Sequence, residues 1–402
     1  MTIEDLMRAA GVTAWPARWQ TFFDEVTADF DAHGCPFADP AFYDDLHARY
    51  GAPDADLALY QKAAAAIAKE EPLARLLSLL VRAMRDRTEF VAECKEFKQP
   101  PIREEGKDPG RAMLTALAVA AYIPYTHDLL ARRGMPPAVI TEALRMPENG
   151  VAEYRVRHGG ADGFILLDWC QRTVDGHLFP VGRLEAEIGA SFHGHAKVFR
   201  HRDGRVVALA HDLPLHKSGL ALGAAGCTDE AGSFTAMVTE TDDAFCGYAF
   251  GPDGHVRKKP VALPRDEWTL ALQYGDPTLG LHIPPAGKLT PEAVDASLAD
   301  IKTFVAAYFP DYHYRAFTCN SWLMDPQLET LLDPDANIVR FGRRFIRLTR
   351  KSDGNAVFYF AFRLPEPVPP ETLPEDTRLW RALKAHYLSG RVIYEDVGFF
   401  LP

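Results

Sequence analysis

Apolar positions along the first 147 residues repeat at the spacing of α-helices. They recur every three or four residues in stretches near residues 19–30, 57–64 and 73–81, and this spacing places side chains on one helix face. Glycine and proline residues separate the stretches, as they do where helices end. We therefore predict an all-helical N-terminal domain over residues 1–147.

The pattern changes after residue 147 to short alternating or aromatic segments. The segments with this character lie at residues 164–170, 178–188, 196–200, 206–210, 234–239, 338–348 and 356–364. Such segments are typical of β-strands. Asp-Gly pairs at residues 175–176, 203–204, 253–254 and 353–354 favour tight hairpins, because both residue types tolerate positive φ. Residues 148–402 are predicted to form an α+β domain around a mixed, largely antiparallel sheet.

Two apolar segments of this second domain are each followed by a well-marked helix start. Residues 279–284 lead to a helix beginning near Thr290, and residues 314–322 break at Asp325 and Pro326. Strand, loop, helix and strand in this order place the loop and the helix N-terminus at one sheet edge. This edge is where we expect a phosphate-bearing ligand.

The loop before the first of these helices has the residues of a phosphate cradle. Thr290 can cap the helix through its hydroxyl, and Gly287 and Lys288 precede it. Free N–H groups at a helix N-terminus bind phosphate oxygens. Gly287, Lys288 and Thr290 are therefore candidate phosphate ligands, and an ordinary helix start is the alternative interpretation.

Polar residues at the ends of the two strands are candidates for chemistry. His282 alternates with Leu281 and Ile283, so its imidazole faces the other side of the sheet, where it could act as a general base. Asn320 and Ser321 could hydrogen-bond an amide or a leaving thiolate. The alternatives are a structural histidine and polar residues that cap the next helix.

Composition and charge exclude several classes of protein. Apolar residues make up 47% and charged residues 25% of the chain, and the formal net charge is −11. This balance is ordinary for a globular protein and argues against nucleic-acid binding, which needs positive charge. No apolar run has the roughly 20 residues of a membrane span, and the N-terminus lacks signal-peptide features. We expect a cytoplasmic protein with neither a membrane nor a nucleic acid as partner.

A metal centre is the weaker interpretation of the histidines and cysteines. His193 and His195 would lie on one face of a strand, but no acidic residue follows in a recognised ligand spacing, and arginines at residues 200, 202 and 205 would oppose a cation. The six cysteines form no CxxC pair. We expect no metal ligand and no disulfide. The basic run over residues 340–351 is interpreted as a solvated strand edge.

At this point the sequence resembles a known family, the acyltransferase-like proteins that join a helical N-acyltransferase N-terminal domain to a GNAT-like C-terminal domain. The resemblance rests on four segments: DGHLFPVGRL at 175–184, GDPTLGLHIP at 275–284, LTPEAVDASL at 289–298 and NSWLMDPQL at 320–328. Together with the helical first half, it covers nearly the whole chain.

The resemblance implies an acyl-CoA site. In the GNAT fold two neighbouring strands splay apart, the pantetheine arm pairs with backbone in the gap, and the pyrophosphate rests on the next helix N-terminus. Here it implies that residues 279–284 and 314–320 splay, with Leu281, Ile283 and Phe317 beside the gap. The superfamily phosphate loop, Gln/Arg-x-x-Gly-x-Gly/Ala, is absent, and Pro284 and Pro285 remove N–H donors.

The function implied by the resemblance is transfer of an acyl group from a CoA or carrier-protein thioester to a small-molecule amine. The thioester is a co-substrate, and no tightly bound cofactor is expected. His282 would be the base, backbone N–H groups near residues 281–283 would polarise the carbonyl, and Ser321, beside Asn320, would protonate the thiolate. Glu185 and Glu187 are reserve bases. The alternatives are a non-catalytic ligand- or partner-binding protein and a metal-dependent hydrolase.

Overall fold

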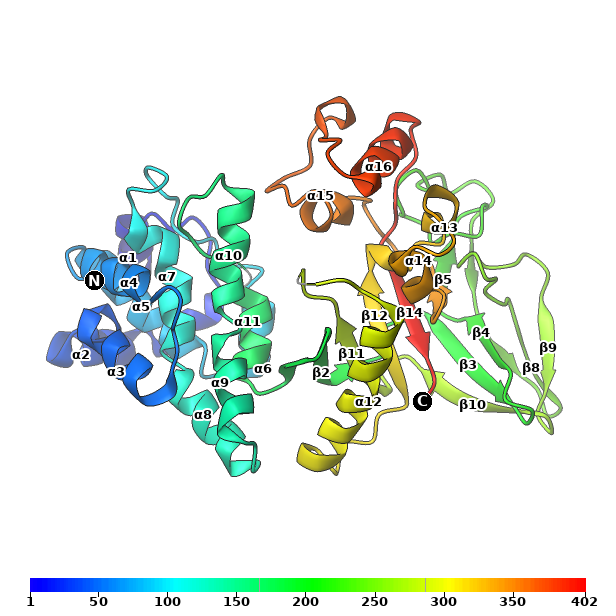
Figure 1. Ribbon diagram of the computed structural model, residues 1–402, viewed down its shortest axis with the longest axis horizontal. Coiled ribbons are helices and arrows are strands. Elements are labelled where there is room, and N and C mark those ends of the chain that lie inside the picture. The colour runs from blue at the N-terminus through cyan, green and yellow to red at the C-terminus, as the bar shows by residue number, and fades with distance from the viewer. Residues whose placement is uncertain (166, 286) are drawn as a thin grey trace. The chain divides into compact units, whose positions relative to one another are not determined.

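The protein folds into two compact units, Met1–Phe179 and Pro180–Pro402. The computed structural model describes residues 1–165, 167–285 and 287–402, apart from the side chains of residues 87, 88 and 91. Figure 1 shows that the first unit is helical and that the second is built on strands. None of the helices in these ranges is long and apolar enough to cross a membrane.

The first unit is a bundle of helices around α7. Its helices are α1 (Ile3–Ala10), α2 (Gln20–His33), α3 (Pro40–Tyr50), α4 (Leu57–Ile67), α5 (Glu71–Ala83), α6 (Arg87–Glu93), α7 (Pro109–Ala120), α8 (Ile123–Arg132), α9 (Pro137–Arg145), α10 (Glu148–Arg157) and α11 (Leu167–Val174). After its first residue α7 is buried on every side, and α4, α5 and α11 pack against it. Arg111 enters this core because Glu70 accepts from both of its Nη atoms at 3.0–3.1 Å.

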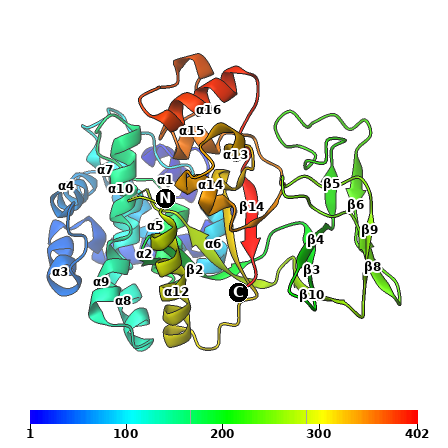
Figure 2. The ribbon, with the colours of Figure 1, turned by 45° about the vertical axis from the view of Figure 1, so that its right-hand side comes forward.

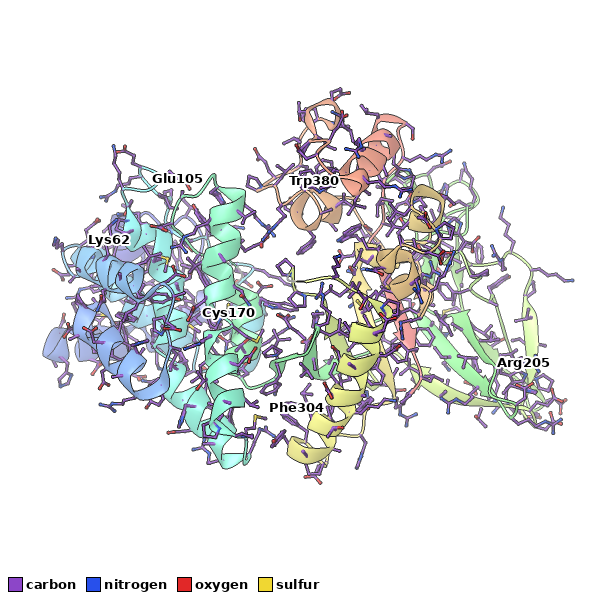
Figure 3. The ribbon with its side chains drawn as sticks, in the orientation of Figure 1. Lys62, Glu105, Cys170, Arg205, Phe304 and Trp380 are labelled. Carbon is purple, nitrogen blue, oxygen red and sulfur yellow. The ribbon has the colours of Figure 1, made fainter. Side chains whose placement is uncertain are left out.

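The strand predicted over residues 164–170 is wrong in its described part from Leu167 onward. Cys170 lies on α11 (Figure 3), and it is buried together with Gln171, Thr173 and Val174 against neighbouring helices. A short apolar run fits the spacing of a strand or of a helix, so burial of one helix face decides which structure forms. The helical unit therefore extends beyond residue 147, where the sequence pattern changes.

The second unit is built on a six-stranded mixed sheet in the order β1-β2-β11-β12-β14-β13. Its strands are β1 (Leu178–Val181), β2 (Leu184–Ser191), β11 (Pro277–His282), β12 (Ala316–Ser321), β13 (Ile346–Leu348) and β14 (Asp396–Phe400). β11 and β12 are parallel and are joined by α12 (Pro291–Tyr308), whereas β2 with β11, β12 with β14 and β13 with β14 pair antiparallel. The predicted α+β class with a mixed sheet is confirmed.

Eight short strands are inserted between β2 and β11. They are β3 (Ala196–His201), β4 (Val206–Ala210), β5 (Leu213–Leu215), β6 (Phe234–Ala236), β7 (Thr239–Glu240), β8 (Ala244–Gly247), β9 (Val261–Pro264) and β10 (Trp268–Gln273), which form three small sheets (Figure 2). The β3-β4 turn carries Arg205 at its tip (Figure 3). The sheet β10-β3-β4 packs on the six-stranded sheet, as Val198 and Leu272 share a core with Ala316 and Phe399.

Of two further predicted strands, the one over residues 338–348 is correct only at its end, in β13, and the one over residues 356–364 is wrong. Residues 338–348 form α14 (Asn337–Gly342) followed by β13, and residues 356–364 begin with α15 (Ala356–Phe360).

The basic run over residues 340–351 is also not a solvated strand edge. Glu329 pairs with Arg343 at 2.8 Å and with Arg347 at 2.5 Å, and Arg344 pairs with Asp295. Three of its arginines are thus held by carboxylates from α12 and α13 (Leu328–Leu331). The chain also contains the helix α16 (Arg378–Leu388), which Thr377 caps by accepting from the backbone N–H of Trp380.

Two carboxyl groups are buried near the start of β14. Asp396 is 3% exposed, and its Oδ1 has no hydrogen-bond partner in the described part of the chain. Burial raises the pKa of Asp396 well above its ordinary value, and the nearby Asp325 carboxylate raises it further. Asp325 is as deeply buried but accepts from the backbone N–H groups of Gln327 and Tyr394. Asp396 is therefore the costlier of the two to ionise.

Replacing Asp396 should make the protein more stable at high pH. The folded state holds a proton on Asp396 above the unfolded pKa of about 3.9, so its stabilising contribution is full below that pH and is lost as pH rises through the folded pKa. We expect Asp396→Asn to raise the melting temperature at pH 8 by about 2–4 °C and to give a smaller gain at pH 5. Calorimetry across this range measures it. The exposed Asp311→Asn is the control, and a gain independent of pH would contradict the prediction.

Candidate active site

The central feature of the site is that β11 and β12 part at their C-terminal ends. Their parallel ladder joins residues 278–280 to residues 316–318. Beyond these rungs, in the described residues of both strands, β11 continues only with β2 and β12 only with β14. Figure 1 shows the two strands with α12 beside them. The edges of residues 281–282 and 319–321 that face each other therefore carry no ladder hydrogen bonds.

His282 lies at the end of β11 and is held by a carboxylate. Its Nε2 lies 2.8 Å from Oε2 of Glu187 on β2, and both side chains are about one-fifth exposed. The pair depends on Gly280. A Cβ at Gly280 would lie 3.0 Å from Cβ of Glu187 and 3.3 Å from Nε2 of His282. Glycine leaves the space in which the two side chains meet.

A second carboxyl lies directly across from His282. Glu185 is its partner in the β2-β11 register and is 6% exposed. Burial raises the pKa of Glu185, and the nearby His282 and Arg183 lower it in part. Since side chains two apart on a strand share a face, Glu185, Glu187 and His282 form one cluster. The structure thus brings together three of the residues proposed from the sequence.

Asn320 and Ser321 lie on opposite faces of β12. Thr318 is paired with Gly280, so strand alternation places the exposed Asn320 on the face that carries His282. Ser321 faces the other way, and its Oγ accepts from the backbone N–H of Leu323 at 3.1 Å, capping the turn Trp322–Met324. Cys319 is buried, which raises its pKa to about 12 and leaves it a poor nucleophile.

The start of α12 is built as the sequence predicts. Thr290 caps it by accepting from the N–H of Ala293 at 3.3 Å, and Pro291 is its first residue. In the preceding loop Gly287 has φ +72° and Lys288 is exposed. Leu281 is buried on β11 and Ile283 half-buried beyond it. Phe317 lies within the paired part of the ladder, where its ring stacks on Phe400 at 4.8 Å.

Arg183 is a candidate ligand that the sequence interpretation missed. It lies in the turn between β1 and β2, where its N–H donates to Oγ of Ser297 on α12 at 2.7 Å. Its Nη1 donates to the carbonyl of Pro284 at 2.9 Å, and its Nε is buried without a partner in the described residues. Desolvation lowers its pKa. The sequence feature that could have drawn attention to Arg183 is that it is the lone basic residue within the apolar segment 178–188.

The histidines considered for a metal contact an aromatic ring instead. His193 and His195 lie with their ring centroids 5.6 and 5.7 Å from that of Tyr274. Among the described residues, no group of three or more His, Cys, Asp or Glu side chains could hold a metal ion.

A parallel strand pair that opens beside a capped helix defines a GNAT-like fold. The family model of the GNAT-like C-terminal domain matches residues 178–400, and that of the N-acyltransferase N-terminal domain matches residues 41–176. The chain therefore belongs to the family of GNAT-like proteins with a helical N-acyltransferase N-terminal domain.

Solved structures share this fold over the whole chain. An acyltransferase in complex with decanoyl-CoA and teicoplanin is 23% identical, with a TM-score of 0.66 and complete coverage of both chains. A complex with CoA and 10C-teicoplanin has the same identity, coverage and TM-score, and a mutant acyltransferase with octanoyl-CoA has 23% identity, complete coverage and a TM-score of 0.64. No curated protein matches the chain in sequence.

Adding a side chain at Gly280 should separate Glu187 from His282. We expect Gly280→Ala to lower the free energy of unfolding by about 1–3 kcal/mol, because the new methyl group crowds the Glu187 stem. The cost should be smaller in a Glu187→Gly background, where the Cβ of Glu187 that would lie 3.0 Å from the new methyl group is absent. Denaturant unfolding of the four proteins in this cycle measures it. An equal cost in both backgrounds would show that the contact with Glu187 is not the cause.

Proposed function

We propose that the protein is an N-acyltransferase that moves an acyl group from acyl-CoA to an amine. The observation that carries the proposal is the end of the β11-β12 ladder beside the His282-Glu187 pair, in a chain of the GNAT-like family. Solved structures of similar fold are acyltransferases in complexes with decanoyl-CoA, octanoyl-CoA and CoA. They support a medium-chain acyl thioester as the donor.

The open edges of the two strands suit the amide-containing arm of the donor. Backbone groups of residues 281–282 have no strand partner on the β12 side, so an extended chain can pair with them as an added strand does. N–H groups near Leu281 and Ile283 would then lie beside the thioester and stabilise the oxyanion that forms on its carbonyl. Phe317 lies in the paired part of the ladder, so it would form the closed end of this gap.

The phosphates need positive groups, because the usual loop is absent. Pro284 and Pro285 supply no N–H groups. Arg183 brings a guanidinium with an unpartnered Nε to the same loop, and Lys288 and the start of α12 at Thr290 lie further along it, with Gly287 between. Arg183 is therefore proposed as the main phosphate ligand, since a guanidinium binds phosphate through several N–H groups.

His282 is proposed as the base. Glu187 accepts from Nε2–H, which fixes the tautomer whose Nδ1 lone pair can take a proton from the amine. The amine nitrogen then attacks the thioester carbonyl carbon, the new C–N bond forms, and the C–S bond breaks. Glu185 stabilises the charged imidazole from the opposite strand. Asn320, exposed on the same face, can hydrogen-bond the acceptor.

Ser321 is proposed to return a proton to the departing thiolate. Its Oγ accepts from Leu323 but keeps its own hydrogen for donation. The thiolate leaves between the two strands, so a donor on the face opposite His282 is compatible with this step. The products are an amide and free CoA, and the proton that His282 took from the amine returns through solvent to the Ser321 alkoxide.

Removal of the base should slow turnover without loss of donor binding. With decanoyl-CoA and a panel of amines that includes teicoplanin, we expect His282→Ala to lower kcat by about 10²–10⁴-fold and to change the Kd for decanoyl-CoA by less than about threefold. Release of the CoA thiol measures the rate, and calorimetry measures binding. His313→Ala, at an exposed position, is the matched control. Unchanged kcat in His282→Ala would rule out this base.

Loss of Arg183 should weaken binding only of donors that carry phosphates. We expect Arg183→Gln to raise the Kd for CoA by about tenfold and to leave that for decanoyl-pantetheine, which lacks the phosphates, unchanged. Calorimetric titration compares the two ligands, with the exposed Arg202→Gln as the control. An equal effect on both ligands would contradict the role of Arg183. Failure of the unmodified protein to bind any CoA thioester would instead contradict the donor itself.

A further inference from the structure

A second pocket lies within the strands that are inserted between β2 and β11. Its volume is about 210 Å³, and residues of β5 and β6 and the segments after β8 line it. Its lining shares no residue with the gap between β11 and β12. Pockets that hold drug-sized ligands are larger, about 300–1,000 Å³. A ligand here would be no bigger than a single ring with one substituent.

One side of the pocket is apolar and aromatic. Leu215 and Val256 are buried in it. The rings of Phe234 and Tyr248 lie 5.1 Å apart at 59° to each other, and Phe234 is 39% exposed. Two tilted rings that reach solvent offer both a face and an edge to a third ring. This side favours a flat aromatic group over a flexible chain.

The other side supplies a hydrogen-bond donor. His216 is buried, and its Nδ1 accepts from the N–H of Ser218 at 3.2 Å, with the hydroxyl of the same serine 2.8 Å away. Because Nδ1 acts as an acceptor, the ring proton is on Nε2, which is then a donor. An acceptor group on the ligand would match it.

The pocket also carries an ammonium group that forms no ion pair with a carboxylate of the described residues. Lys217 is paired with Asp229 at 2.7 Å. Lys258, which also lines the pocket, is exposed and has no ion pair within the described part of the chain. In a chain of net charge −11, this ammonium is available to an anion.

We propose that this pocket binds a small aromatic carboxylate. The ring would contact Phe234 and Tyr248, and the carboxylate would accept from Lys258 and from Nε2 of His216. An apolar wall with few polar groups placed to fix orientation is typical of small-molecule sites. The site is additional to the acyl-transfer site and does not depend on the donor proposed for it.

Benzoate is the probe that tests the site. We expect saturable binding by NMR titration, with at least about fivefold weaker binding of the neutral benzamide. Lys258→Gln and Phe234→Ala should each raise the Kd for benzoate at least about fivefold. The adjacent Lys259→Gln, at an exposed position that does not line the pocket, should leave it unchanged. Saturating CoA should not displace benzoate.

Several results would overturn the proposal. They are the absence of benzoate binding at tens of millimolar, equal weakening by Lys258→Gln and Lys259→Gln, and displacement by CoA. Binding of butyrate as tight as that of benzoate would overturn the aromatic preference. Circular dichroism of each variant keeps a loss of fold from being mistaken for a loss of the site, and the surface position of Lys258 makes its variant the decisive one.

Discussion

The chemistry of the second unit depends on the point where the parallel ladder between β11 and β12 stops. Up to Gly280 and Thr318 the strands satisfy each other's backbone groups, and beyond that point each is held only by its outer neighbour. Unpaired backbone groups within a sheet are costly unless water or a ligand satisfies them. Beyond the last rung, the strand edges therefore carry backbone groups that need hydrogen-bond partners. The extended arm of a thioester donor can supply these partners.

The same register sets the polar cluster beside this opening. The antiparallel pairing of β2 with β11 brings Glu185 opposite His282 and Glu187 opposite Gly280. A shift of β2 by one residue would turn Glu185 and Glu187 to the other face, which carries Leu281, and would separate them from His282. Phe399 and Ala316 lie at the other end of the sheet face that carries His282. Their packing against the inserted sheet holds the neighbouring strands in place. Apolar packing at one end thus fixes the geometry of polar groups at the other.

The sequence predicts the elements whose signals are local. The cap at Thr290 and the apolar segment that contains His282 identify α12 and β11, and the family matches confirm the acyltransferase family and fold class. Three predicted strands, at residues 164–170, 338–348 and 356–364, failed in whole or in part because a short apolar run suits a helix equally well, and only burial against neighbours decides between them. Arg183 stands out in its segment only as a lone basic residue, and its place beside the loop before α12 depends on a contact with Ser297, 114 residues away in the chain.

The inserted strands have a consequence for how the family can vary. His282 and Glu187 are 95 positions apart in the chain, and nearly all of the intervening residues belong to the inserted segment that carries the three small sheets. The entropy lost on closing such a loop grows only with the logarithm of its length, about 0.6 kcal/mol per doubling. An insert of this kind can grow, shrink or acquire new surfaces at little thermodynamic cost. Evolution can therefore reshape what surrounds the His282-Glu187 pair while the two strands that carry it stay in register.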